Sequence, residues 1–201
     1  MESGRFSKIK FRSLWETAMK KLFLVLAPLL CLSIEANAAE VVVEVSSTTR
    51  HSPKAILDAV TDYENACDNG CKYRVKGLKE TKVLEDDGDR QVVWQQINNV
   101  RTVKQFLVNE VRTLEDGTMI LSSQIPENKT LEELKAKYDL PHSTPFRSMK
   151  LVWEARTSKD GQTFINGSMK VDHNLPRMAN GIIRNSIRAS LNEVLANLEN
   201  I

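Results

Sequence analysis

The sequence is poor in the side chains that carry most nucleophilic and metal chemistry. Its 201 residues include three cysteines and three histidines. A structural zinc site takes four closely spaced Cys or His ligands, and no such cluster is present in the sequence. The histidines also have no neighbouring motif that would indicate a catalytic triad. The sequence therefore predicts no metal ligands, no cofactor and no catalytic residues.

An excess of positive charge is also missing. Of 28 basic and 26 acidic side chains, six basic and three acidic ones lie in residues 1–38. Residues 39–201 thus hold 22 basic against 23 acidic side chains. Because a nucleic-acid-binding surface needs clustered positive charge, we expect no nucleic-acid partner. Residues 39–201 also lack repeats and linkers, and their length suits one domain.

No apolar run is long enough to span a bilayer, which takes about 20 residues. The main apolar run, residues 22–34, follows two lysines and precedes an A-x-A site at residues 36–38. These features are typical of a secretory signal peptide. We expect residues 1–38 to be an N-terminal extension with a cleaved signal, and the remaining domain to be periplasmic or secreted. An uncleaved anchor is the alternative for the run, and Met19 is an alternative start.

Two cysteines, Cys67 and Cys71, remain beyond the signal segment, on either side of the turn sequence 68–70. In an oxidising compartment such a pair can form a disulfide, and we predict one here. Its contribution to stability should be small because the closed loop is short. Two free thiols, or redox or metal chemistry, are the alternatives.

What the chain does have is a run of strand-like segments. Seven segments are rich in β-branched residues or alternate with period two, and several end at Asp-Gly turns. They are residues 41–45, 73–85, 90–98, 103–114, 118–125, 149–155 and 163–171.

Three helices are also predicted. Ser52 and Pro53 are typical of a helix start, and Thr130 should cap a short helix over residues 130–138. A long amphipathic helix should begin near Pro176. Its apolar stripe comprises Ile183, Ile187, Leu191, Val194, Leu198 and Ile201. The order of elements indicates an α+β fold, in which a curved antiparallel sheet and a terminal helix enclose a hollow lined by apolar side chains.

Two segments resemble a known family. Residues 52–64 resemble the first helix of START-like proteins of the polyketide-cyclase and lipid-transport group, and residues 75–85 resemble their second strand. The resemblance implies a helix-grip fold, a curved seven-stranded antiparallel sheet wrapped around a long C-terminal helix. It also implies a cavity for a lipid, sterol, quinone or polyketide. Residues 66–71 depart from the aromatic and proline found in the family, and the family has no universal catalytic residues to carry over.

The candidate ligand-binding residues are those expected to face the helix stripe or the opening of the grip. They are Tyr63, Phe106, Met119, Leu121, Trp153, Ile165, Met169, His173, Met178 and Ile182. Plain core packing is the alternative for the apolar residues. His173 could anchor a polar head group or act as a general base; the alternative is a histidine bonded to backbone or water.

Three functions are compatible with this pattern. The first is an exported carrier of a lipid or other hydrophobic molecule, with transient membrane contact. The second is a cyclase or hydrolase that uses His173 on a polyketide-like substrate, and the third is an adaptor that binds a protein segment. Apart from His173, the inward positions of the predicted strands are mostly apolar. This favours the carrier over the enzyme.

Overall fold

The computed structural model describes residues 39–66, 77–98, 102–199 and 201. These residues belong to one compact unit, Ala38–Ile201. The predicted signal segment, its cleavage site and the Cys67–Cys71 disulfide lie outside the described residues. So does the first part of the second predicted strand.

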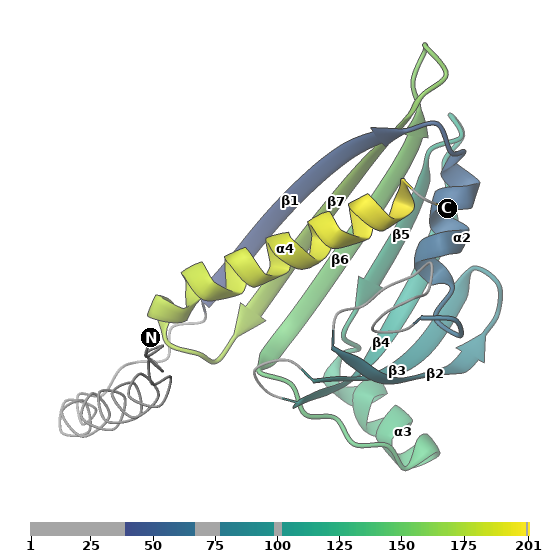
Figure 1. Ribbon diagram of the computed structural model, residues 1–201. Coiled ribbons are helices and arrows are strands. Elements are labelled where there is room, and N and C mark those ends of the chain that lie inside the picture. Colours follow the sequence, from purple (N-terminus) through teal and green to yellow (C-terminus); the bar gives the residue numbers. More distant parts are fainter. Residues whose placement is uncertain (1–38, 67–76, 99–101, 200) are drawn as a thin grey trace, which may run out of the picture. The chain divides into compact units, whose positions relative to one another are not determined.

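Seven strands form one antiparallel sheet in the order β1-β7-β6-β5-β4-β3-β2 (Figure 1). The strands are β1 (Ala39–Thr49), β2 (Leu78–Asp86), β3 (Arg90–Asn98), β4 (Thr102–Thr113), β5 (Met119–Gln124), β6 (Phe146–Thr157) and β7 (Thr163–His173). The first and last strands along the chain are neighbours, so β1 pairs with β7 over its whole length. The seven predicted strands and the α+β class are confirmed.

The hairpins follow from the turn residues that the sequence analysis singled out. In the β2–β3 turn, Gly88 has a φ of 84°, which side chains disfavour. Its N–H donates to Asp86 Oδ1 over 2.9 Å. Gly167, in the middle of β7, has a different role, because a Cβ there would lie 2.4 Å from the Trp153 ring. The glycine allows the indole to lie flat against the neighbouring strand.

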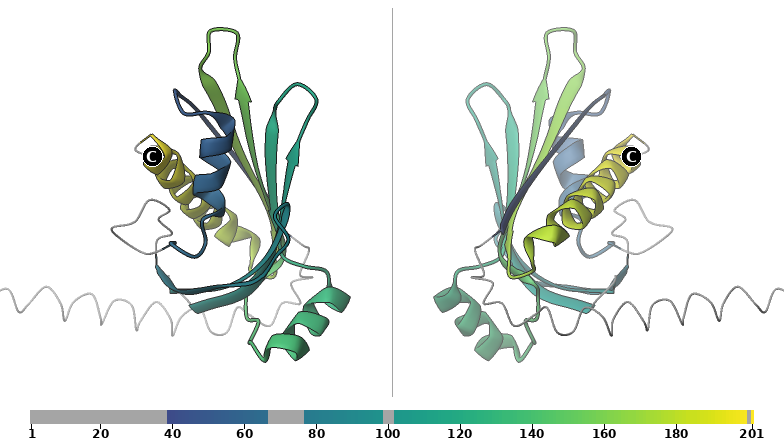
Figure 2. Two further views of the ribbon diagram at one scale, coloured as in Figure 1. Left: turned by 90° about the vertical axis from the view of Figure 1, so that its right-hand side faces the viewer. Right: turned by 90° about the vertical axis from the view of Figure 1, so that its left-hand side faces the viewer.

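The sheet curves strongly from β6 and β7 towards β2 and β3 (Figure 2). Register shifts occur at two places in the β2–β3 pairing and at one place in β6–β7. Such bulges add local twist and bend a strand.

Within the described ranges, three α-helices lie on the sheet, and they cover different faces. α2 (Pro53–Thr61) packs against β5 and β6, and α4 (Asn180–Leu198) packs against β1. α3 (Asn128–Tyr138) lies on the opposite side (Figure 2). We call the side of α2 and α4 the inner face and the side of α3 the outer face.

The structure tests the two helix caps that the sequence predicted, Ser52 and Thr130. Ser52 does cap α2, since its Oγ accepts from the backbone N–H of Ala55 over 3.2 Å. The predicted Thr130 cap of α3 is wrong, because the helix begins at Asn128, after Glu127, and no side chain caps it. A 3-10 turn, η2 (Arg177–Ala179), precedes α4 after Pro176.

Each face has its own hydrophobic core. The larger core lies on the inner face, where the α4 stripe packs with α2 and with β1 and β4 to β7. Five residues of that stripe are buried: Ile183, Ile187, Leu191, Leu195 and Leu198. Val194 and Ile201, which were also predicted for the stripe, are half-buried and pack against this core.

The smaller core lies between β3, β4 and α3 on the outer face, and its buried members are Val92, Trp94, Phe106, Val108 and Leu134. Trp94 Nε1 donates to the carbonyl of Pro141 over 2.8 Å, which ties the segment after α3 to the sheet. The expectation that Phe106 faces the α4 stripe is therefore wrong. Its ring packs on the other side of the sheet.

Candidate functional site

The inner face is the part of the molecule where the sequence predicted a ligand site. Side chains alternate between the two faces along each strand, so strand register shows which residues share the inner face. Leu121, Trp153 and Gly167 occupy partner positions on β5, β6 and β7. Trp153 is buried in the inner core, so its partners also point inwards.

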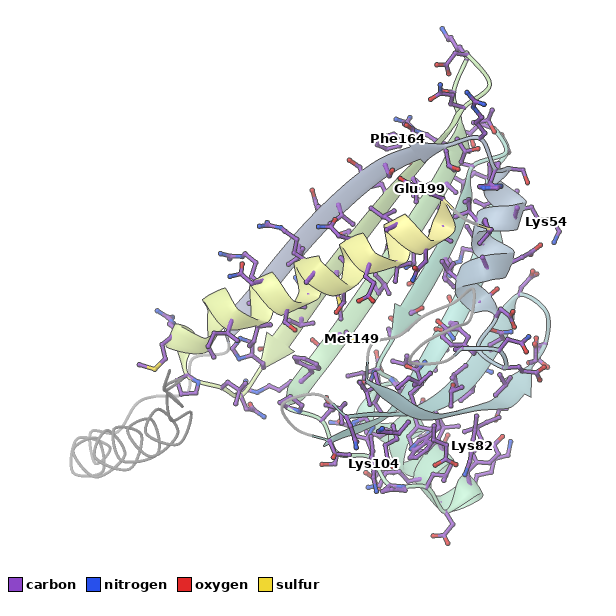
Figure 3. The ribbon with its side chains drawn as sticks, viewed as in Figure 1. Lys54, Lys82, Lys104, Met149, Phe164 and Glu199 are labelled. Carbon is purple, nitrogen blue, oxygen red and sulfur yellow. The ribbon has the colours of Figure 1, made fainter. Side chains whose placement is uncertain are left out.

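The structure brings five of the predicted apolar residues together on this face. Leu121, Trp153 and Ile165 are fully buried in the inner core, while Met119 and Met169 are half-buried against it. Met149, labelled in Figure 3, lies on the same face of β6. The half-buried methionines retain exposed surface, so they are better placed than the three fully buried residues to touch a ligand.

Three other predicted residues lie elsewhere. Tyr63 is buried, but it follows the end of α2 and belongs to neither core. Met178 is 86% exposed and Ile182 is 74% exposed. Both lie beside the buried stripe of α4 and face solvent, so the structure does not place them against the sheet.

His173 ends β7 on the inner face and is 1% exposed. Its Nδ1 accepts a hydrogen bond from the backbone N–H of Leu175 over 3.2 Å. In the neutral ring the proton is therefore on Nε2. Nε2 is buried and has no partner among the residues described. One nitrogen thus bonds the backbone, as the alternative interpretation of the sequence predicted, and the role of His173 as a head-group anchor or general base stays a prediction.

A row of neutral polar side chains on the inner face was missed by the sequence analysis. Gln91, Asn109 and Ser123 are partners across β3, β4 and β5. Asn109 and Ser123 are each 1% exposed, and neither Asn109 Oδ1 or Nδ2 nor Ser123 Oγ has a partner among the described atoms. Gln91 Nε2 donates to Asp86 Oδ2 over 2.9 Å, whereas its buried Oε1 is unpartnered.

A second polar row lies four residues further along the strands. It consists of Thr81, Gln95 and Gln105, with Val93 and Leu107 between the two rows. Thr81 Oγ1 and Gln105 Oε1 are buried without a partner in the described part of the chain. A buried polar atom without a hydrogen bond costs about 1–3 kcal/mol, so an inner face with several of them is expected to meet polar groups.

A small hollow adjoins the first row. It has a volume of about 30 Å³ and is lined by Thr61, Gly88, Asp89, Gln91, Asn109 and Val111. A space of about 10–15 Å³ suffices for one water-sized group. The hollow therefore has room for a small polar group within reach of Asn109.

Charge is almost absent from the inner faces of β3, β4, β5 and β7, whereas on β2 the exposed Asp86 lies opposite Gln91. Of the inward residues on β3, β4, β5 and β7, and on β6 from Met149 onward, His173 alone can ionise. An enzyme would be expected to collect several ionisable groups in its site. Among the described residues no group of three or more His, Cys, Asp or Glu side chains could hold a metal ion.

The charged interactions gather instead on the outer face. Glu85 Oε1 accepts from Lys137 Nζ and from the Tyr138 hydroxyl, each over 2.9 Å, and Oε2 accepts from Arg90 over 3.1 Å. These bonds lower the pKa of Glu85 from 4.5 to about 2. The bond from Lys137 contributes most, followed by the bonds from Tyr138 and Arg90. Lys82 Nζ lies 5.5 Å from the Trp94 ring centre on the same side of the sheet (Figure 3). The bonds from Lys137 and Tyr138 attach α3 to β2. The Arg90 and Lys82 contacts join β2 to β3.

Comparisons with known proteins bear on the fold. No protein-family model and no curated protein matches the sequence. The STAR-related lipid transfer protein of Xanthomonas axonopodis matches with a TM-score of 0.54 and 10% identity, over 77% of this chain and 84% of that one. Human StAR-related lipid transfer protein 5 matches with a TM-score of 0.53 and 9% identity, over 94% and 97%.

The chain has the START-like helix-grip fold. The human StarD13 lipid transfer and protein localization domain also matches over 98% of both chains, with a TM-score of 0.53 and 12% identity. The START-like fold predicted from residues 52–64 and 75–85 is thus confirmed over nearly the whole length of the described domain. In the described ranges no helix is long and apolar enough to cross a membrane.

Proposed function

We propose that the protein is exported and holds a lipid or similar hydrophobic small molecule between the inner face of the sheet and α4. The observation that carries the proposal is the chemistry of the inner face, whose inward residues are apolar or neutral across five strands except for His173. Small-molecule sites are commonly apolar with a few convergent polar groups. Two of the matched structures carry the name lipid transfer protein, which supports a lipid as the ligand class.

The arrangement of the helices also supports this proposal. α4 packs against β1, at one edge of the sheet, whereas β2 is the strand at the other edge. A ligand would lie against the inward residues of β3 to β6 that retain exposed surface, such as Val111, Met119 and Leu151. Export rests on the basic, apolar and A-x-A pattern of residues 1–38.

The alternatives have less support. A cyclase or hydrolase would have His173 as its one ionisable inner-face residue on the strands compared above. An adaptor would expose a large apolar patch. The exposed large hydrophobic residues of the described chain are Val42, Leu114, Met178 and Ile182.

Met178 and Ile182 favour transient membrane contact as part of the same function. They lie one helical turn apart, and Arg177, Arg184 and Arg188 are exposed near them. Residues 174–192 contain no acidic side chain. Exposed apolar groups among arginines suit an anionic lipid surface, at which a carrier could load or release its ligand.

The proposal is tested by titrating purified protein with N-phenyl-1-naphthylamine, an uncharged fluorescent probe of apolar sites. Saturable binding to one site per chain, reversed by a long-chain lipid, is the expected result. Absence of saturable binding to the folded protein would refute the carrier function.

A further inference from the structure

The polar row formed by Gln91, Asn109 and Ser123 contains buried atoms that have no hydrogen-bond partner among the described residues. Asn109 and Ser123 are buried, and the side chains of a row lie about 5 Å apart at Cβ. Even so, Asn109 Oδ1 and Nδ2, Ser123 Oγ and Gln91 Oε1 are left without a hydrogen bond among the atoms described. Buried polar atoms in folded proteins are generally paired with protein, water or ligand.

The position of this row links it to the ligand site. Its residues share the inner face with Leu107 and Leu121, which belong to the inner core. The hollow of about 30 Å³ beside Asn109 can accommodate one small group. An apolar chain that lies along the inner face would therefore bring its end to these amides.

The donors and acceptors of this polar row determine which kind of ligand head group it can bind. Asn109 supplies an amide donor and a carbonyl acceptor, Gln91 supplies a second carbonyl acceptor, and Ser123 can donate or accept. A carboxylate would face two carbonyl oxygens with Asp89 at the edge of the hollow. The carboxylates nearest to an ammonium would be those of Asp86 and Asp89, but both are exposed to solvent, and Asp86 already accepts from Gln91 Nε2 and from a backbone N–H. A buried ammonium beside Asn109 would therefore lack a paired charge, which is disfavoured.

We infer that Gln91, Asn109 and Ser123 form a subsite for the uncharged polar head of the ligand, a hydroxyl or carboxamide group that both donates and accepts hydrogen bonds. The inference rests on the proposed carrier function and narrows its ligand to neutral amphiphiles. Fatty alcohols, acylglycerols and fatty amides have this chemistry, whereas free fatty acids and alkylamines do not.

The test compares four competitors with one chain length: dodecanol, dodecanamide, dodecanoate and dodecylamine. Each displaces N-phenyl-1-naphthylamine from the purified protein at neutral pH. We expect the alcohol and the amide to displace the probe at concentrations about tenfold lower than the two charged compounds, as one hydrogen bond in a buried site allows. A preference for the carboxylate or the amine would overturn the inference.

The variant Asn109→Leu removes the amide and keeps the side-chain size. It should reduce the preference to about twofold or less, where the preference is the ratio of competitor affinities measured against the variant's own affinity for the probe. Gln96→Leu is the matched control, because Gln96 lies on the outer face of β3 between Glu80 and Lys104. Ser123→Ala serves as a second variant should Asn109→Leu fail to fold.

The outcomes separate this inference from the carrier function. If the wild-type protein does not bind the probe, the carrier function fails. If it binds the probe but shows no head-group preference, or if Asn109→Leu and Ser123→Ala keep the wild-type preference, the row holds water only and the subsite is refuted.

Discussion

The two faces of the sheet differ in how completely their buried polar side chains are hydrogen-bonded. On the outer face, Trp94 Nε1 bonds Pro141, and Glu85 accepts three hydrogen bonds that join α3 to β2 and β3. On the inner face, Asn109 and Ser123 are buried without hydrogen-bond partners among the residues that the structure describes. The outer-face contacts therefore fasten α3 to the sheet, whereas the inner face combines the larger core with unpartnered polar groups that are typical of a site. Changes to the two faces should have separable effects on stability and on binding.

Among the proposed variants, the largest expected effect on stability is at Trp94 on the outer face. Trp94→Ala removes a buried indole and its hydrogen bond, so it should lower the free energy of unfolding by about 3–5 kcal/mol. Urea denaturation followed by circular dichroism measures this. The fraction that stays folded should bind the fluorescent probe as the wild type does. A large change in its affinity would show that the faces are not independent.

On the inner face, Met169→Asp should act chiefly on binding. Met169 is half-buried against the inner core, and a carboxylate there would oppose an apolar ligand, so we expect probe affinity to fall by about tenfold or more. Met178→Asp is the matched control, because Met178 is 86% exposed. Equal probe affinities for the two variants would argue against a ligand at Met169.

The contribution of the outer face to folding stability should depend on pH because of Glu85. Because its pKa falls from 4.5 to about 2 on folding, its contribution to stability is complete above about pH 4.5. That contribution is lost as the pH falls towards 2. Glu85→Gln should cost about 1 kcal/mol at neutral pH and should have a shallower decline in Tm between pH 4.5 and 2. Parallel Tm curves for variant and wild type across this range would contradict the assignment.

The smallest effect on stability should come from the start of α4. Replacing the exposed Met178 and Ile182 together with Ser should change the free energy of unfolding by less than about 0.5 kcal/mol. The double variant should lose sedimentation with anionic phosphatidylglycerol vesicles, while neither protein should bind phosphatidylcholine vesicles. Retained sedimentation of the variant would place the membrane contact elsewhere.

The sequence predicted the parts of the fold that have a local cause. Ser52 caps α2, Gly88 forms a turn between strands, and Trp153 lies on the inward side of a cleanly alternating strand. The start of α3 was missed by two residues because Thr130 offered a better capping side chain than Glu127, the residue that holds that position.

The candidate site was harder to predict because β4 has no alternation in its middle. Residues 105–109 are all buried, since α3 covers one side and the inner core covers the other. Choosing Phe106 as an inward residue assigned Gln105 and Asn109 to the outside, and the polar rows were therefore missed. Only the packing of α3, a tertiary contact, decides between the two assignments.

Met178 and Ile182 show a second limit of pattern reading. Ile182 lies one residue, about 100° of helix rotation, from the buried Ile183, and Met178 lies in the 3-10 turn before α4. Their apolar character suggested that both residues line the ligand site near the opening of the grip, but the structure exposes both to solvent.

The most direct test of a bound hydrophobic molecule is native mass spectrometry of protein purified from its native source without detergent. The account predicts an added mass that dissociates on activation. Organic extraction should recover it as an uncharged lipid-like compound, and Met169→Asp should carry less of it than Met178→Asp. A protein that carries no added mass, and takes none up after incubation with a lipid extract, would contradict the account.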